Sequence, residues 1–229
     1  MEGLFKLNRR HFNALAWLAG TLGVCSPVLV QATVHAAGAQ TASLPTVLIV
    51  GDSLSAEYGL KRGTGWVALL EQQLAQQKVK VRIVNASISG DTTSGGRSRL
   101  PALLKQHQPA VVVLELGGND ALRGLPLNMT RDNLAHMARI SSEAGARVLL
   151  LGMEMPPNYG AKYGQEFRNV FSGVAQAEKT ALVPFFLKGV GDLKDPTQLF
   201  QADRIHPNEV AQPIMRDNVW PELRKLLPR

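Results

Sequence analysis

Two short segments far apart in the chain hold residue types that can cleave acyl bonds. Ser53 ends the run Thr46-Val-Leu-Ile-Val-Gly-Asp-Ser53, and His206 lies three residues after Asp203. An aspartate at this spacing can accept a hydrogen bond from Nδ1 of the histidine, which leaves Nε2 free to take a proton from a serine hydroxyl. The residues therefore indicate acyl transfer, with Ser53 as nucleophile, His206 as general base and Asp203 as the residue that orients the base.

Each segment also has a purely structural explanation. Gly51-Asp52-Ser53 is a common turn sequence, and a serine after a strand can cap the next helix. Asp203 and His206 could equally form a structural turn. The Gly-x-Ser-x-Gly sequence of α/β-hydrolases does not occur around Ser53, because Ser55 stands at the second glycine position. If Ser53 acts in catalysis, we expect it at the start of a helix, where the helix dipole favours an anion.

Acyl transfer also needs hydrogen-bond donors for the oxyanion. Gly90 follows the second predicted strand, and its N–H can approach a substrate because no Cβ is in the way. Asn119 follows two glycines after the third predicted strand, so its amide could point into the cleft. The backbone N–H of Ser53 is a third candidate. The structural alternatives are a turn glycine at Gly90 and an Asx turn at Asn119.

Strands and helices alternate regularly along the chain, which predicts a parallel sheet with crossover helices. We expect an α/β fold, a flavodoxin-like doubly wound sheet of about five parallel strands with helices on both faces. Small or polar residues follow the predicted strands, so the loops that carry the candidate residues should meet at one edge. The predicted strands cover about 46–50, 78–84, 110–116, 147–151 and 182–186, and the predicted helices about 66–77, 94–106, 130–143, 162–179 and 208–226, with a loop at 121–129.

Composition limits the classes of function. The 229 residues are 45% hydrophobic and 19% charged, as expected of a globular chain. The net charge is +7, but no basic run exceeds a pair and no aromatic-rich patch accompanies it, which argues against a nucleic-acid partner. Histidines are sparse and no phosphate-binding loop occurs, so we expect no metal and no cofactor.

The N-terminus is typical of a secretory signal peptide. Lys6, Arg9 and Arg10 precede an apolar stretch at about 12–30, and small residues follow at 34–39. We expect a signal peptide at 1–36, a linker at 37–45 and the catalytic domain at 46–229, in a periplasmic or secreted protein. The alternative is an uncleaved membrane anchor, although glycines and a proline interrupt the apolar stretch. The only cysteine, Cys25, would be removed with the signal peptide.

From residue 46 to the C-terminus the chain resembles the GDSL/SGNH hydrolases. Within that family it is most similar to the secreted arylesterase, thioesterase I and lysophospholipase branch, through residues 114–125 and 153–159. The resemblance implies the roles given above for the catalytic and oxyanion residues, and a structural role for Asp52. The four segments that carry it are Gly51-Asp-Ser-Leu-Ser55, Gly90-Asp-Thr-Thr93, Gly117-Gly-Asn-Asp120 and Asp203-Arg-Ile-His-Pro207.

Three positions depart from the pattern expected of this family. Glu57 and Ala121 stand where glycine is expected, and Arg204 replaces a small residue between the aspartate and the histidine. None of these changes removes a group with a predicted catalytic role. They bear on substrate preference more than on the reaction.

Apolar side chains beside the candidate site could bind an acyl chain, or could simply pack the loops together. We expect a monomeric esterase and thioesterase acting on small acyl substrates: aryl esters, acyl-CoA and lysophospholipids. The alternatives are a carbohydrate O-acetyl esterase and a non-catalytic lipid- or glycan-binding module. The predicted substrate-binding residues are Leu122, Leu125, Pro126, Met155, Pro156 and Tyr159.

Overall fold

Five apolar segments form one parallel sheet in the computed structural model, which describes residues 44–228. The two central strands are buried along their whole length, as expected where helices cover both faces of a parallel sheet. The strand order is β2-β1-β3-β4-β5, and each neighbouring pair is parallel. The strands are β1 (Thr46–Gly51), β2 (Arg82–Asn85), β3 (Val111–Glu115), β4 (Arg147–Leu151) and β5 (Ala181–Val183).

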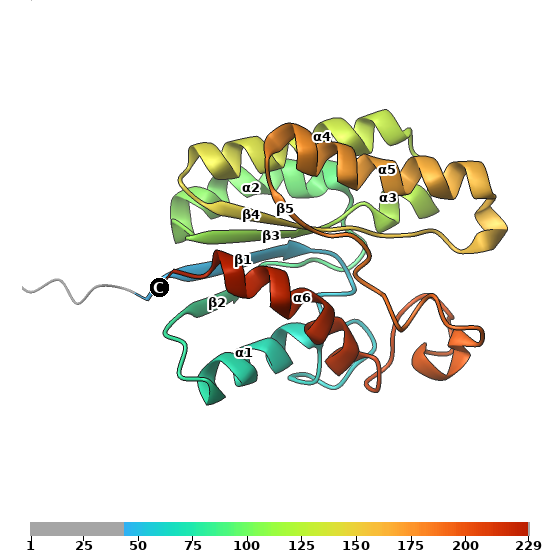
Figure 1. Cartoon of the computed structure of the whole chain (residues 1–229), viewed down its shortest axis with the longest axis horizontal. Coiled ribbons are helices and arrows are strands. Elements are labelled where there is room, and N and C mark those ends of the chain that lie inside the picture. Colours follow the sequence, from blue (N-terminus) through green and yellow to red (C-terminus); the bar gives the residue numbers. More distant parts are fainter. Residues whose placement is uncertain (1–43, 229) are drawn as a thin grey trace, which may run out of the picture. The chain divides into compact units, whose positions relative to one another are not determined.

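The helices form two layers, one on each face of the sheet (Figure 1). One layer holds α2 (Thr93–His107), α3 (Gly118–Leu122), α4 (Leu127–Glu143) and α5 (Ala161–Glu178). The other holds α1 (Trp66–Gln76) and α6 (Gln212–Leu226), which pack against each other. Two short 3₁₀ helices, η1 (Pro157–Tyr159) and η2 (Pro196–Leu199), lie in the connections. The predicted doubly wound α/β fold is confirmed.

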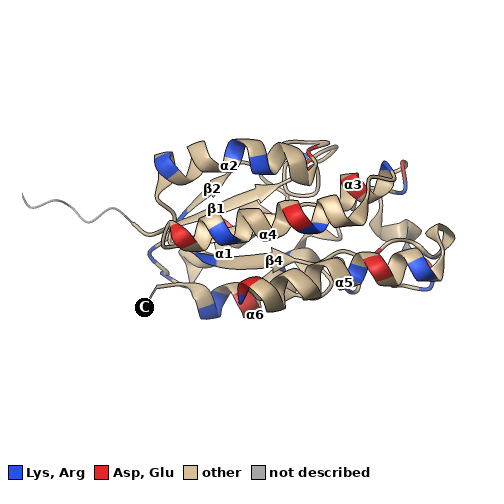
Figure 2. Ribbon diagram, turned by 90° about the horizontal axis from the view of Figure 1, so that it is seen from above, with Lys and Arg blue, Asp and Glu red and all other residues tan. Residues whose placement is uncertain are grey.

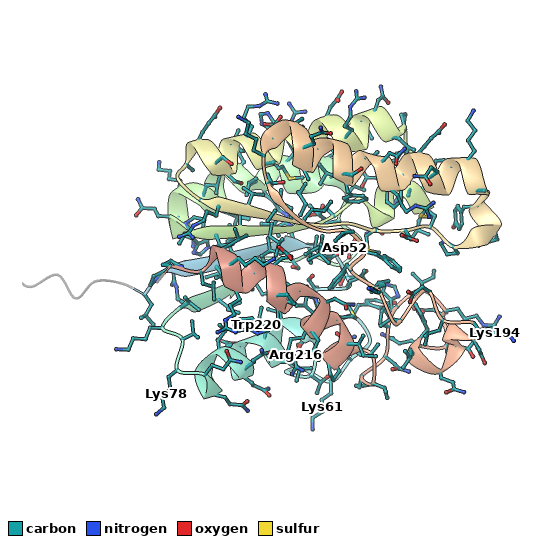
Figure 3. All side chains as sticks on the ribbon, in the orientation of Figure 1. Asp52, Lys61, Lys78, Lys194, Arg216 and Trp220 are labelled. Carbon is teal, nitrogen blue, oxygen red and sulfur yellow. The ribbon has the colours of Figure 1, made fainter. Side chains whose placement is uncertain are left out.

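The order of the strands creates a crevice at the carboxyl ends of β1 and β3. From β1 the chain passes through α1 to β2 on one side, and then returns through α2 to β3 on the other side of β1. Ligands bind outside the strand ends at such a switch point in open α/β sheets. Asp52, the residue after β1, lies at this edge between the two helix layers (Figure 3).

Some element boundaries differ from those predicted. Residues 121–129 do not form one loop, because α3 covers Gly118–Leu122 and α4 begins at Leu127. The predicted helix start at about residue 130 is therefore too late: Thr130 lies inside α4, and its hydroxyl donates to the buried Asp120. The second strand is shorter than predicted, and the last helix begins at Gln212 instead of 208.

A buried polar cluster joins α2, α3 and α4. The carboxylate of Asp120 accepts hydrogen bonds from the backbone N–H and the hydroxyl of Thr93, the first residue of α2. Asn133 of α4 donates to the same hydroxyl over 3.0 Å. Because buried polar groups are costly unless they are paired, this cluster fixes where α3 begins and hence where Asn119 lies.

Basic and acidic residues alternate on the outer faces of α4, α5 and α6, whereas α2 carries only basic ones (Figure 2). None of the helices between residues 44 and 228 combines the length and the apolar character that a membrane crossing needs. The predicted signal peptide, 1–36, and residues 37–43 of the predicted linker lie outside the described residues.

Candidate active site

Ser53 lies directly beyond β1, in a tight turn. Its side chain is largely covered, with 8% of the residue exposed. The carbonyl of Asp52 accepts N–H groups from Ser55 and Ala56, which curls the chain just after the strand. No α-helix follows at once, because α1 begins only at Trp66. The expectation that Ser53 begins a helix is therefore wrong.

Close packing beneath the turn explains Gly51. A Cβ at this residue would lie 2.7 Å from Oε2 of Glu115 and 2.8 Å from Oγ of Ser55. Those two atoms are themselves hydrogen-bonded over 2.7 Å. Glycine is thus required for the close approach of β1 to the buried Glu115.

Ser53, His206 and Asp203 form a continuous hydrogen-bonded series. Nε2 of His206 lies 2.9 Å from Oγ of Ser53, although the two residues are 153 positions apart. Nδ1 of His206 lies 2.7 Å from Oδ2 of Asp203. With the proton on Nδ1, the imidazole donates to Asp203 and accepts from the serine hydroxyl, as a general base must.

The turn from Asp203 to His206 is built to hold the carboxylate ionised. Oδ1 of Asp203 accepts the backbone N–H groups of Ile205 and His206, at 2.9 and 3.0 Å. The hydrogen bond from the His206 N–H is the largest of the causes that lower the pKa of Asp203 to about 2. Arg204, between them, adopts φ 59°, a left-handed conformation that explains why a small residue is expected there.

Tyr58 was not anticipated as a neighbour of the site. Its ring centroid lies 4.4 Å from that of His206, with the planes tilted by 40°. Tyr58 is half exposed, and its carbonyl accepts a 2.8 Å hydrogen bond from the side chain of Gln201. Tyr58 and Gln201 belong to no recognisable sequence motif. Their positions near His206 depend on how two separate loops meet.

Two backbone N–H groups near the serine lack protein acceptors. Within residues 44–228, neither the N–H of Ser53 nor that of Gly90 donates a hydrogen bond to the protein. Gly90 adopts φ 78°, which favours glycine, and its carbonyl accepts a 2.8 Å hydrogen bond from Arg123. Both N–H groups are therefore available to a ligand.

Asn119 is placed beside the serine turn, but its amide is engaged. Nδ2 donates to Oδ2 of Asp52 over 3.0 Å and to the carbonyl of Asp91 over 2.9 Å. These bonds fix the orientation of the amide. To donate to an oxyanion, Asn119 must share or release the hydrogen that now points at the Asp91 carbonyl.

Two buried carboxyl groups lie under the site. Burial raises the pKa of Asp52 to about 6, against hydrogen bonds from the N–H of Leu54 and the amide of Asn119, which lower it. Glu115 is 1% exposed, and burial, together with the nearby Asp52 carboxyl, raises its pKa well above the usual range. Asp52 lies in a recognisable motif, whereas nothing in the sequence marks Glu115 as buried, since a charged residue at the end of a strand is usually exposed.

The predicted substrate-binding residues lie in two segments at the same edge of the sheet. Leu122, Leu125 and Pro126 follow Asn119, whereas Met155, Pro156 and Tyr159 lie between β4 and α5. The hydroxyl of Tyr163 in α5 donates to the carbonyl of Ala121, which brings the two segments together. Leu122 and Tyr159 are 41% and 39% exposed, and Met155 packs partly against the core.

A separate pocket of about 420 Å³ lies beside the serine turn. Polar and apolar side chains share it, and none of the predicted substrate-binding residues lines it. Its walls are Ala56, Glu57, Leu60, Arg62, Asn85 and Ser87. Glu57 adopts φ 58°, and its carboxylate accepts the N–H groups of Gly63 and Gly65. The departure from glycine at position 57 is thus offset by hydrogen bonds.

Among the described residues, no cluster of His, Cys, Asp or Glu is suited to hold a metal ion.

A parallel α/β sheet with a hydrogen-bonded serine, histidine and aspartate at its carboxyl edge is typical of one class of protein, the hydrolases that cleave acyl bonds. The model of the GDSL-like Lipase/Acylhydrolase family matches residues 49–212. The chain belongs to this family, and the predicted family and the predicted ester hydrolase are both confirmed.

Known relatives cover most of the chain. An esterase, TesA, from Pseudomonas aeruginosa is 54% identical over 188 residues, which is 82% of this chain and 92% of the relative. The Thioesterase 1/protease 1/lysophospholipase L1 of Escherichia coli is 43% identical over 188 residues, or 82% and 88% of the two chains. A crystal structure of TesA has a TM-score of 0.76 at 55% identity, covering 80% of this chain and 99% of that one.

Proposed function

We propose that the protein hydrolyses carboxylic esters and acyl thioesters through an acyl-enzyme on Ser53. The observation that carries the proposal is the pair of hydrogen bonds, 2.9 and 2.7 Å long, that links Oγ of Ser53 through His206 to Asp203. This arrangement supplies a nucleophile, a base and a group that orients the base. The names of the relatives, esterase and thioesterase, support the choice of ester and thioester bonds.

In the first half of the reaction, Oγ of Ser53 attacks the acyl carbon while Nε2 of His206 takes the hydroxyl proton. The carbonyl electron pair moves onto oxygen, giving a tetrahedral oxyanion. When this intermediate collapses, the bond from carbon to the leaving oxygen or sulfur breaks, and His206 returns the proton to the alcohol or thiol. Water then repeats the sequence on the acyl-enzyme and releases the carboxylic acid.

The ionised Asp203 has two effects in this scheme. It holds the imidazole in the tautomer with the proton on Nδ1, and it stabilises the imidazolium that forms in each transition state. Its pKa of about 2 means that it stays charged wherever His206 can act as a base. We assign the oxyanion to the N–H groups of Ser53 and Gly90, with Asn119 as a third donor once its hydrogen to Asp91 is shared.

The acyl chain is proposed to lie over the two apolar segments after β3 and β4. Their exposed side chains, Leu122 and Tyr159, offer apolar surface beside the carboxyl edge where Ser53 lies. Each methylene buried there contributes about 0.8 kcal/mol to binding. Longer acyl chains should therefore be preferred to acetyl. A strict preference for acetyl esters of sugars would instead favour the carbohydrate esterase.

Replacement of Ser53 tests the function. The Ser53→Ala variant should lose about 10⁴-fold or more in kcat on p-nitrophenyl esters and on acyl-CoA, because no acyl-enzyme can form. A fluorophosphonate should label the unmodified protein and leave the variant unlabelled. Full turnover by the variant would refute the assignment. A series of acyl chain lengths with esters, acyl-CoAs and lysophospholipids then identifies the preferred substrate.

The location of the reaction follows from the N-terminal sequence. Export with removal of residues 1–36 would place a monomeric, cysteine-free enzyme in the periplasm or outside the cell. The proposal is supported by the order of basic, apolar and small residues before position 40. Mass spectrometry of the exported protein tests it, and a retained N-terminus would contradict it.

A further inference from the structure

We propose that Arg99 of α2 is a positioning residue that sets the spacing of the oxyanion donors. The inference rests on the proposed function, because it assigns a role in the same site. The side chain of Arg99 is only 19% exposed, although α2 carries its other basic residues, Arg97 and Lys105, on its exposed surface.

The guanidinium of Arg99 contacts three separate strand-end segments. Nε donates to Oδ2 of Asp91 over 2.8 Å, and Nη2 donates to the carbonyl of Gly51 over 3.3 Å. Nη1 donates to the carbonyl of Ala86. Gly51 ends β1, Ala86 follows β2, and Asp91 comes immediately after Gly90. One side chain therefore joins the segment that carries Ser53 to the one that carries Gly90.

The third donor is tied to the same cluster through Asp91. The carboxylate of Asp91 is held by Arg99, and the backbone carbonyl of Asp91 accepts the 2.9 Å hydrogen bond from Asn119. Fixing Asp91 thus fixes the acceptor that orients the Asn119 amide. All three candidate donors are connected to one guanidinium, although Arg99 itself contacts none of their donor atoms.

The chemistry of the oxyanion explains why such a connection matters. Backbone N–H groups have no rotamers, so only the positions of their segments bring Ser53 and Gly90 to the right separation. Oxyanion donors are effective only when held within about 0.5 Å of the productive geometry. Arginine suits this role because its planar fork presents five N–H donors at fixed angles, which the single ammonium of lysine cannot reproduce.

The experiment compares Arg99→Ala and Arg99→Lys with Lys105→Ala. Lys105 is the control on the same helix, since it is exposed and, within residues 44–228, makes no hydrogen bond or ion pair. We expect kcat on a p-nitrophenyl ester to fall about 10- to 100-fold in both Arg99 variants, because the donors shift without being removed. KM should change less than about threefold, since the acyl-binding segments are untouched. Lys105→Ala should retain wild-type values.

Chemical rescue separates positioning from a loss of folding. Guanidinium chloride at concentrations below the unfolding transition should restore part of the kcat of Arg99→Ala, whereas sodium chloride of equal ionic strength should not. A boronic acid, which forms a tetrahedral adduct with the serine, should bind the Arg99 variants more weakly by about the factor lost in kcat.

Three outcomes would overturn the inference. They are unchanged kcat in both Arg99 variants, a loss confined to KM, and a loss of kcat that guanidinium fails to rescue while boronic acid binding stays normal. Ser53→Ala in the same assay keeps the two proposals apart. If that variant is inactive and the Arg99 variants are normal, only the role of Arg99 fails. If Ser53→Ala turns over normally, the proposed function fails.

Discussion

At the scale of single residues, Arg204 shows that the turn from Asp203 to His206 carries conformational strain. Its φ of 59° lies in the left-handed region, where a side chain with Cβ costs about 1–2 kcal/mol. Asp203 and His206 are held by this turn, through two backbone N–H groups that point at the carboxylate. The strain at Arg204 therefore lies in the turn that maintains the hydrogen bond between Asp203 and His206.

Glycine at position 204 should remove that strain. We expect Arg204→Gly to raise the free energy of unfolding by about 0.5–1 kcal/mol, because the relief exceeds the entropy that glycine loses on folding. Urea unfolding measures the change. Arg204→Ala is the control, since it removes the guanidinium but keeps Cβ, and it should give no gain. Equal stability of the two variants would show that the backbone at this position is not strained.

The sequence predicts the three residues of the hydrogen-bonded series, but not the residues that surround them. Ser53, Asp203 and His206 are recognisable because short spacings and residue types state their chemistry. Tyr58, Glu115 and Arg99 contact residues that are distant along the chain. Glu115 meets Asp52 across 63 positions, Arg99 meets Gly51 across 48, and Tyr58 meets His206 across 206 − 58 = 148. These contacts exist only after folding. No local pattern distinguishes the inward-turned Arg99 from its exposed neighbour Arg97.

At the scale of elements, α1 receives its N-terminal cap from another helix. Gly65, which precedes the helix, has no side chain to accept an N–H group. Oε1 of Gln212, at the start of α6, accepts the N–H of Trp66 over 3.0 Å, and its Nε2 donates to the carbonyl of Asn208. Gln212 is almost fully buried. It therefore joins α1 to the segment that follows His206.

Loss of this cap should destabilise the whole chain. We expect Gln212→Ala to lower the free energy of unfolding by about 1–3 kcal/mol, because the buried N–H of Trp66 is left without an acceptor. Chemical denaturation gives the value. Gln76→Ala, on the exposed surface of α1, is the comparison and should change stability by less than about 0.5 kcal/mol. Similar free energies of unfolding for Gln212→Ala and Gln76→Ala would contradict a stabilising role for this cap.

The succession of elements was predictable because apolar strands and amphipathic helices alternate with clear periods. The short helix α3 was not, since its five residues are too few for a periodic pattern. It is held by the burial of Asp120 against Thr93, a contact made across 27 positions. The start of α6 was missed for a similar reason, because Asn208 uses its side chain to bond the carbonyl of Gln198 in place of continuing the helix.

At the scale of the whole molecule, two buried acids lie at the carboxyl ends of the two central strands. Asp52 follows β1 and Glu115 ends β3, and both have raised pKa values because they are buried. An acid with a raised pKa keeps its proton in the folded chain at a pH where the unfolded chain has released it. Its contribution to stability is therefore complete below the unfolded pKa and is lost as the pH rises through the folded pKa.

This reasoning predicts the pH dependence of stability. The unfolding free energy of the wild type should decline as the pH rises from about 4, where the unfolded carboxyl groups ionise, through the pKa of about 6 of Asp52. The raised pKa of Glu115 should add to this decline. In Glu115→Gln the neutral amide cannot ionise, so this variant should gain stability relative to the wild type as the pH rises. Urea unfolding at several pH values measures the difference, and Glu71→Gln on exposed α1 is the control. If the unfolding free energies of Glu115→Gln and the wild type differed by the same amount at every pH, Glu115 would not be titrating in this range.

The pKa shift of Asp203 has the opposite sign. Its lowered pKa gives stability that is lost only below about pH 4, so Asp203 cannot produce the decline.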